Sequence, residues 1–193
     1  HVWHIREYGQ PDYNLKLDLG KKTFGFLLKQ ATAIICISQD IKSSVLSGLK
    51  LKHCQVIYNG VFSQDELKTI KVKLKPYQPK KDFTFIIIGQ INSNKNQSEA
   101  VTAFKLLMNK YPQTKLWIVG DYRTPTGATL KKACDKKNYR DRIIFFDFVR
   151  EPLKLLAQAN CLLMCSKHEG FGRVTVEAMT YGKPVIGFDS SGT

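Results

Sequence analysis

Cysteine is scarce in this sequence, and its pattern excludes two kinds of site. The five cysteines are odd in number and form no Cys-x-x-Cys pair, so we expect free thiols in a reducing compartment and no zinc site. Long apolar runs are also missing, because no stretch approaches the roughly 20 residues that a membrane-spanning helix needs. The chain opens without a signal-peptide pattern or an initiator Met, and we therefore expect it to be the interior of a longer polypeptide.

Acidic residues are the next shortage. The 16 Asp and Glu face 30 Lys and Arg, and the resulting net charge of +14 attracts anionic partners such as nucleic acid, an anionic membrane face or phosphorylated small molecules. The basic residues gather at 68–81 and 131–142. Neither cluster interleaves surface aromatics, and no nucleic-acid-binding signature is present, so nucleic acid is the weaker interpretation. We expect a cytoplasmic protein, and the membrane interpretation adds peripheral contact with the inner membrane face.

Strand and helix patterns alternate along the whole chain. Short apolar runs predict strands at 2–5, 33–37, 55–58, 83–88, 116–119, 143–146, 161–164 and 184–188. Amphipathic spacing and capping residues predict helices at 15–29, 38–48, around 100–111, at 126–137, after Pro152 and at 173–181. Strands joined by helices predict an α/β fold, in which a Rossmann-like parallel sheet has helices on both faces. Ligands of such sheets bind beyond the carboxyl ends of the strands, where the loops at Gly89, Gly120 and Glu169 lie.

The stretch from Glu169 to Glu177, with the sequence EGFGRVTVE, carries the chemistry. Two carboxylates eight positions apart flank a glycine-bearing turn that leads into a helix. Gly170 and Gly172 allow a tight turn and a close approach of ligand to the main chain. The free N–H groups of the following helix attract phosphate. A sugar nucleotide fits this pattern, since it offers a diphosphate for the helix end and hydroxyls for both carboxylates.

With EAM following at 177–179 and GKPVI at 182–186, the segment 83–193 resembles the carboxy-terminal domain of retaining GT-B glycosyltransferases of family 4, the group 1 glycosyl transferases. The signature of that family is E-x7-E. The resemblance implies that Glu169 contacts the hydroxyls of the donor sugar and that Glu177 contacts the nucleotide ribose. It also places four intervening residues in the donor site: Gly170, Phe171, Gly172 and Arg173.

The resemblance extends to the first strand of this domain, which in the family ends in Gly-Arg followed by a Lys that helps to hold the diphosphate. Gly89 and Lys95 match, whereas Gln90 stands where Arg is usual. The diphosphate charge would then rest on Lys95, Arg173 and the helix end. The resemblance implies no metal and no cofactor other than the nucleotide diphosphate sugar as co-substrate.

The first residues are similar to the family's segment that reaches the reactive end of the donor. This makes His4, Arg6 and Glu7 candidate catalytic residues, with His4 or Arg6 facing the sugar. A strand-end salt bridge is the alternative. The resemblance predicts a remnant of the amino-terminal, acceptor-side domain at 1–62, a basic linker at 63–81 with a short helix near Asp65, and a truncated donor domain at 82–193.

We therefore expect the parent protein to move a hexose-type sugar from a UDP-sugar, with retention, to a glycan or lipid-linked acceptor, and we expect this fragment alone to be inactive. Two alternatives stay open. One is a basic module that binds nucleic acid or an anionic membrane, and the other is an epimerase or phosphorylase of similar architecture.

Overall fold

The computed structural model describes residues 1–9, 20–74, 82–136 and 138–192. The chain forms two compact units. Unit 1 consists of His1–Gly60, His168–Gly172 and Asp189–Thr193, and unit 2 consists of Val61–Lys167 and Arg173–Phe188. Each unit has its own parallel sheet and its own buried core.

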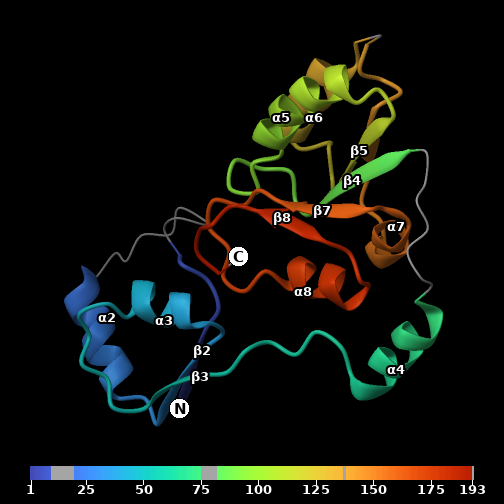
Figure 1. Cartoon of the computed structure of the whole chain (residues 1–193). Coiled ribbons are helices and arrows are strands. Elements are labelled where there is room, and N and C mark those ends of the chain that lie inside the picture. Colours follow the sequence, from blue (N-terminus) through green and yellow to red (C-terminus); the bar gives the residue numbers. More distant parts are fainter. Residues whose placement is uncertain (10–19, 75–81, 137, 193) are drawn as a thin grey trace. The chain divides into compact units, whose positions relative to one another are not determined.

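The described residues of unit 1 form a three-stranded parallel sheet in the order β1-β2-β3 and two helices (Figure 1). The elements are β1 (Val2–Ile5), α2 (Gly20–Lys29), β2 (Ala33–Cys36), α3 (Gln39–Val45) and β3 (Cys54–Val56). Helix α3 begins where the sequence predicts, because the Ser38 hydroxyl accepts a hydrogen bond of 3.1 Å from the Ile41 amide. The predicted helix at 15–29 is present from Gly20, and its residues 15–19 lie outside the described part of the chain.

Unit 2 contains five parallel strands in the order β6-β5-β4-β7-β8. They are β4 (Phe83–Ile88), β5 (Thr114–Val119), β6 (Ile143–Phe146), β7 (Cys161–Met164) and β8 (Val185–Gly187). Sheet growth reverses at β4, since β5 and β6 are added on one side of it and β7 and β8 on the other. The carboxyl ends of β4 and β7 therefore flank a topological switch point, which is where open α/β sheets bind ligands.

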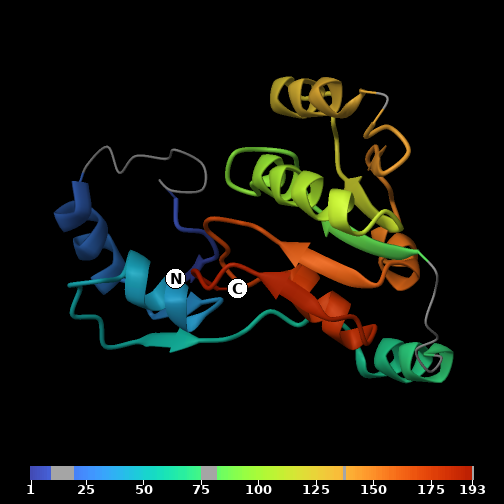
Figure 2. The same cartoon turned by 45° about the horizontal axis from the view of Figure 1, so that its top comes forward.

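Helices cover both faces of this sheet, as predicted. They are α5 (Gln97–Lys110), α6 (Pro125–Cys134), α7 (Pro152–Gln158) and α8 (Arg173–Thr180). Phe104 of α5 and Cys134 of α6 share one core cluster, whereas Leu156 of α7 and Ala178 of α8 share another. Figures 1 and 2 show α5 and α6 together on one side of the sheet, away from α8. The predicted fold class is therefore confirmed.

A ten-residue helix, α4 (Gln64–Lys73), occupies much of the segment that the sequence predicts to be a linker with a short helix. Its start is specified locally by a capping box. The Glu66 amide donates to the Ser63 hydroxyl at 3.3 Å, and the Ser63 amide donates to Glu66 Oε2 at 2.7 Å. Only one face position, Ile70, is buried among the described side chains of α4, which explains the weak apolar period. None of the helices in the described ranges is long and apolar enough to cross a membrane.

All five cysteines are free, in agreement with the sequence prediction, and their burial makes a testable statement about reactivity. The Cys36 thiol is fully buried, 3.9 Å from the Cys54 sulfur, and burial with this neighbour raises its pKa to about 12. At pH 8 roughly one molecule in 10⁴ would carry the Cys36 thiolate that reacts. We expect N-ethylmaleimide to leave Cys36 unmodified in the native protein and to modify it after unfolding, as read by peptide mass spectrometry. If N-ethylmaleimide modified Cys36 of the native protein faster than the half-buried Cys54, the burial of Cys36 would be contradicted.

Candidate functional site

The carboxyl end of β4 exposes main chain at a point that only glycine can form. Gly89 has a φ of +150°. The neighbouring strand β5 ends at Gly120, where a Cβ would stand 2.1 Å from the Gly89 carbonyl oxygen, so both strand ends require glycine. The aliphatic stem of Lys95 lies over Gly89, with carbon atoms 3.8–3.9 Å from the position that a Cβ would take. This geometry brings a lysine to the strand end, and its contact with a diphosphate stays a prediction.

The loop that carries Lys95 is held by hydrogen bonds of its own. The Lys95 amide donates to Asn92 Oδ1 at 2.8 Å, and Gln97 Nε2 donates to the Gln90 carbonyl at 2.9 Å. Asn96 adopts a φ of +57° and precedes α5 without capping it through its side chain. Gln90, which stands at the family's arginine position, is exposed, and its Oε1 accepts from Asn92 Nδ2 at 3.4 Å. The loop therefore places the Lys95 cation and the exposed Gln90 amide after the carboxyl end of β4.

The segment after β7 meets the loop after β4, as the switch-point topology requires. The Lys167 amide donates to the Asn94 carbonyl at 2.8 Å. Ser166, directly before it, is buried with 1 % of its surface exposed. A main-chain hydrogen bond thus joins the two loops of unit 2 that flank the switch point.

Glu177 is a buried carboxylate on α8. Its side chain is 11 % exposed, and the Arg173 guanidinium, one turn earlier, lies 3.4 Å from Oε1 with 63 % of its own side chain exposed. Burial raises the pKa of Glu177, and the charge and hydrogen bond of Arg173 oppose that rise. A carboxylate held in such a place is typical of a functional site, because its charge costs stability.

The turn that carries Glu169 belongs to unit 1. Glu169 Oε1 accepts a hydrogen bond of 3.3 Å from the Gly172 amide, and Gly172 adopts a φ of +70°. A Cβ on Gly170 would stand 2.9 Å from the Arg6 carbonyl oxygen, so glycine is needed there for a close approach of two main-chain segments. Phe171 packs against the core of unit 1, and its ring lies 6.0 Å from that of Tyr58.

The three catalytic candidates near the start of the chain also lie in unit 1. His4 is exposed on β1, opposite Ile35 of β2, and Arg6 and Glu7 are exposed just after the strand. The structure brings the main chain of Arg6 to the Glu169 turn. It also adds Tyr8 and Asp40, which the sequence analysis missed. The Tyr8 hydroxyl donates to Asp40 Oδ2 and lies 3.4 Å from the Glu169 carbonyl oxygen.

The predicted site residues are thus divided between the units. Unit 1 holds His4, Arg6, Glu7, Glu169, Gly170, Phe171 and Gly172, and unit 2 holds Gly89, Gln90, Lys95, Arg173 and Glu177. Across the described ranges, no three His, Cys, Asp or Glu side chains gather where they could hold a metal ion.

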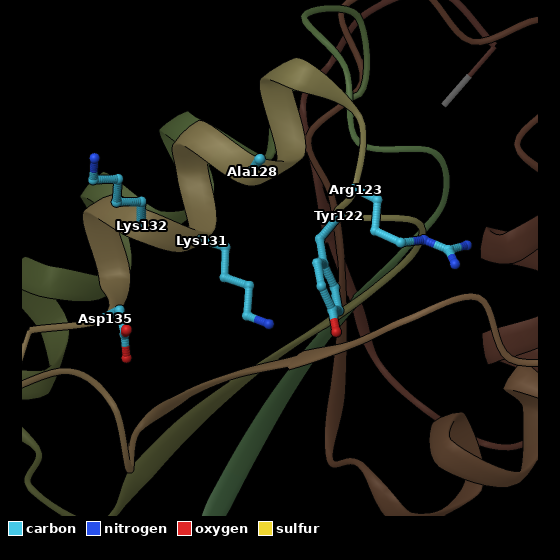
Figure 3. A pocket seen from close by; sticks show the side chains of 6 residues that line it. All are labelled: Tyr122, Arg123, Ala128, Lys131, Lys132 and Asp135. Carbon is cyan, nitrogen blue, oxygen red and sulfur yellow. The ribbon is translucent and has the colours of Figure 1, made fainter.

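A hollow of about 500 Å³ lies beside α6 and includes part of the second basic cluster (Figure 3). In this view Lys131 extends toward Tyr122, and its ammonium lies 3.7 Å from the centre of that ring. Arg123 forms ion pairs with Asp121 at 3.0 Å and Asp147 at 3.6 Å. Lys131 therefore covers one face of the ring of Tyr122, the aromatic side chain among the described lining residues.

Comparison with known sequences assigns the family. A profile of the family described as Glycosyl transferases group 1 matches residues 70–193, which include all the predicted donor-binding residues. The chain is 30% identical over 190 residues to the uncharacterized glycosyltransferase MJ1059 of Methanocaldococcus jannaschii, a match that covers 96% of this chain and 46% of the relative. It is 24% identical over 201 residues to the capsular polysaccharide biosynthesis glycosyltransferase CapM of Staphylococcus aureus, covering 94% and 51%. The chain spans about half the length of the curated relatives it matches.

Solved structures agree on the fold. Anabaena Alr3699/HepE in complex with UDP and glucose superposes with a TM-score of 0.76 at 22% identity, covering 99% of this chain and 53% of that protein. WaaG, a glycosyltransferase involved in lipopolysaccharide biosynthesis, superposes with a TM-score of 0.68 at 16% identity, covering 99% and 57%. The chain therefore belongs to the group 1 glycosyl transferases and has their GT-B fold.

Proposed function

We propose that the protein transfers a sugar from a nucleotide diphosphate sugar, most simply a UDP-sugar, to a glycan or lipid-linked acceptor. The observation that carries the proposal is the family match over residues 70–193, because these residues include Gly89, Lys95 and both glutamates of the E-x7-E pair. The neighbour HepE was solved with UDP and with UDP-glucose, which supports a UDP-sugar donor. Relatives named for capsular and Vi polysaccharide biosynthesis support a glycan acceptor.

The proposed roles follow the chemistry of each side chain. Lys95 and Arg173 would neutralise the diphosphate, with Gln90 donating an uncharged hydrogen bond. Glu177 would accept hydrogen bonds from the ribose hydroxyls, and Glu169 would do the same for the sugar. With the diphosphate stabilised and the sugar oriented, the burden on the protein is positioning and stabilisation of the departing charge.

The test is transfer by the protein at its natural length, offered a panel of UDP-, GDP- and ADP-sugars. We expect a UDP-sugar to be consumed and the product to keep the anomeric configuration of the donor, as read by proton NMR. An inverted product would exclude the retaining mechanism. Steeply salt-dependent binding of single-stranded RNA by a protein that ignores every nucleotide sugar would favour the binding-module alternative instead.

Glu169→Gln is expected to lower kcat by about 100-fold while the Kd for UDP changes less than twofold, because contacts to the reacting sugar strengthen in the transition state. The amide oxygen of glutamine can still accept from the Gly172 amide, so the turn should be preserved. Initial-rate kinetics and calorimetry measure the two quantities. A variant that loses UDP affinity with kcat intact would place Glu169 at the nucleotide instead of the sugar.

A further inference from the structure

The hydroxyl of Tyr8 joins two parts of unit 1 that are far apart in the sequence. Tyr8 stands three residues after β1 and is half-buried. Its hydroxyl donates to Asp40 in the first turn of α3 and lies 3.4 Å from the Glu169 carbonyl oxygen. Its ring packs against that of His168, with centroids 5.9 Å apart. Tyr8 therefore contacts both residues that begin the Glu169 turn.

Asp40 Oδ2 and the Glu169 carbonyl oxygen both accept from the one phenolic proton of Tyr8, and they differ in strength as acceptors. The carboxylate of Asp40 is the stronger acceptor, since hydrogen bonds to ionised groups are roughly twice as strong as neutral ones. The Glu169 carbonyl takes the weaker branch of a three-centre bond. Asp40 is itself fixed on α3, whose first turn is capped by Ser38. Asp40 thus holds the hydroxyl where it meets the main chain of Glu169.

Main-chain contacts hold the same turn from other directions. The Gly192 amide donates to the Glu169 carbonyl at 2.8 Å, and the Arg6 carbonyl lies against Gly170. These contacts fix the path of the main chain. The Tyr8 hydroxyl adds a side-chain contact to the same turn, and this hydroxyl is itself held by Asp40. A displacement of the order of 1 Å at a substrate-positioning group costs about 100-fold in rate, so a contact of this kind can matter for turnover.

We propose that Tyr8 is a positioning residue for sugar transfer: held by Asp40, its hydroxyl fixes the main chain at Glu169 and thereby orients the Glu169 carboxylate. This inference rests on the proposed function, in which that carboxylate contacts the donor sugar.

Tyr8→Phe tests the proposal, because it keeps the ring against His168 and removes only the hydroxyl. We expect kcat to fall about tenfold, with the donor KM and the Kd for UDP within twofold of wild type. Tyr58→Phe is the matched control, since it removes the same atom from an exposed tyrosine whose ring lies 6.0 Å from that of Phe171 in the same turn. A tenfold loss in the control, or none in Tyr8→Phe, would overturn the proposal.

Asp40→Asn separates a positioning role from a general loss of stability. If Asp40 acts through Tyr8, the double variant should be about as active as Tyr8→Phe alone, because residues of one network are not additive. Additive losses that track the fall in Tm would instead indicate two independent structural effects and would contradict the proposal.

Hydrogen exchange gives a readout that needs no turnover. The amides of Gly170, Phe171 and Gly172 are expected to exchange several-fold faster in Tyr8→Phe than in wild type and Tyr58→Phe. Unchanged exchange would overturn the positioning role. If wild-type protein transfers no sugar, the proposed function fails, and the exchange rates still decide whether Tyr8 holds the turn.

Discussion

Replacing Glu177 by glutamine is expected to stabilise the protein and to weaken its binding of UDP. The Glu177 carboxylate is buried on α8, and burial raises its pKa against the opposing charge of Arg173. A carboxyl group whose pKa is higher in the folded than in the unfolded state costs stability once it ionises. Stability therefore falls as the pH rises from the unfolded pKa, about 4.3, through the folded pKa. Removing the charge should raise Tm at pH 7, and this gain should shrink toward pH 4.

UDP affinity should move the opposite way. Glu177→Gln keeps one acceptor oxygen but loses the charge that strengthens hydrogen bonds from a ribose, so we expect the Kd for UDP to rise about tenfold. Glu177→Ala removes both acceptors and should raise it about 100-fold. Calorimetry and thermal unfolding of the same samples measure both effects.

Glu151→Gln is the matched control for Glu177. Glu151 is an exposed carboxylate that pairs with Lys154 at 2.7 Å three residues later, and its side chain is 66 % exposed. The same substitution there should leave Tm and the Kd for UDP unchanged, because an exposed pair contributes little. Unchanged UDP affinity in both Glu177 variants would remove Glu177 from the nucleotide site.

The strands were the most predictable part of the fold. The runs at 83–88 and 143–146 are rich in β-branched and aromatic residues, the run at 161–164 is apolar, and the structure gives the same bounds for all three strands. Helix α4 was harder to predict, because its capping box signals a start while its mostly exposed faces give no apolar period. Local capping chemistry outweighed the absence of an amphipathic pattern.

Candidate site residues could be named from the sequence where they lie in short motifs. The spacing of Glu169 and Glu177, and that of Gly89 and Lys95, could be read directly from the chain. The bond between Tyr8 and Asp40 joins residues 32 positions apart, and Gly170 meets the Arg6 carbonyl across more than 160 positions. No local pattern encodes such contacts. For Gly170 we expected a tight turn and a close approach of ligand to the main chain, and in the structure the group that approaches closely is the Arg6 carbonyl.

The burial of Glu177 was likewise beyond the sequence, since a glutamate on a helix is usually solvated. Its position on α8 follows from the helix phase, which puts Ala178 fully into the core and Glu177 beside it at 9 % exposure. The cost of burying this carboxylate has no structural compensation beyond one exposed arginine among the described residues. A buried charge that costs stability and has so little compensation is typical of a functional site.

Lys95→Ala is expected to lower kcat/KM for the donor by about 100-fold or more. Loss of one preorganised group that stabilises developing charge typically costs 10²–10³ in rate. The substitution should leave the loop intact, because the Lys95 amide, which bonds Asn92 Oδ1, and the Gln97 bond to the Gln90 carbonyl involve no Lys95 side-chain atom. Lys95→Arg keeps a cation and should retain activity within about tenfold of wild type. The remaining loss is expected because a guanidinium differs from an ammonium in reach and geometry.

Gln90→Arg completes the test, because it restores the charge that the family usually carries at the end of β4. Gln90 is exposed beside Gly89, so the longer arginine side chain can extend into solvent. We expect it to lower the Kd for UDP by roughly threefold to tenfold and to recover part of the activity lost in Lys95→Ala, since both cations would act on one diphosphate. Lys110→Ala, which removes a lysine at the far end of α5 whose ammonium lies 5.5 Å from the Tyr111 ring, is the control for total charge. If Lys95→Ala and Lys110→Ala lost equal activity, Lys95 would contribute only through the total positive charge of the protein. If Gln90→Arg did not bind UDP more tightly, the loop after β4 would not contact the diphosphate.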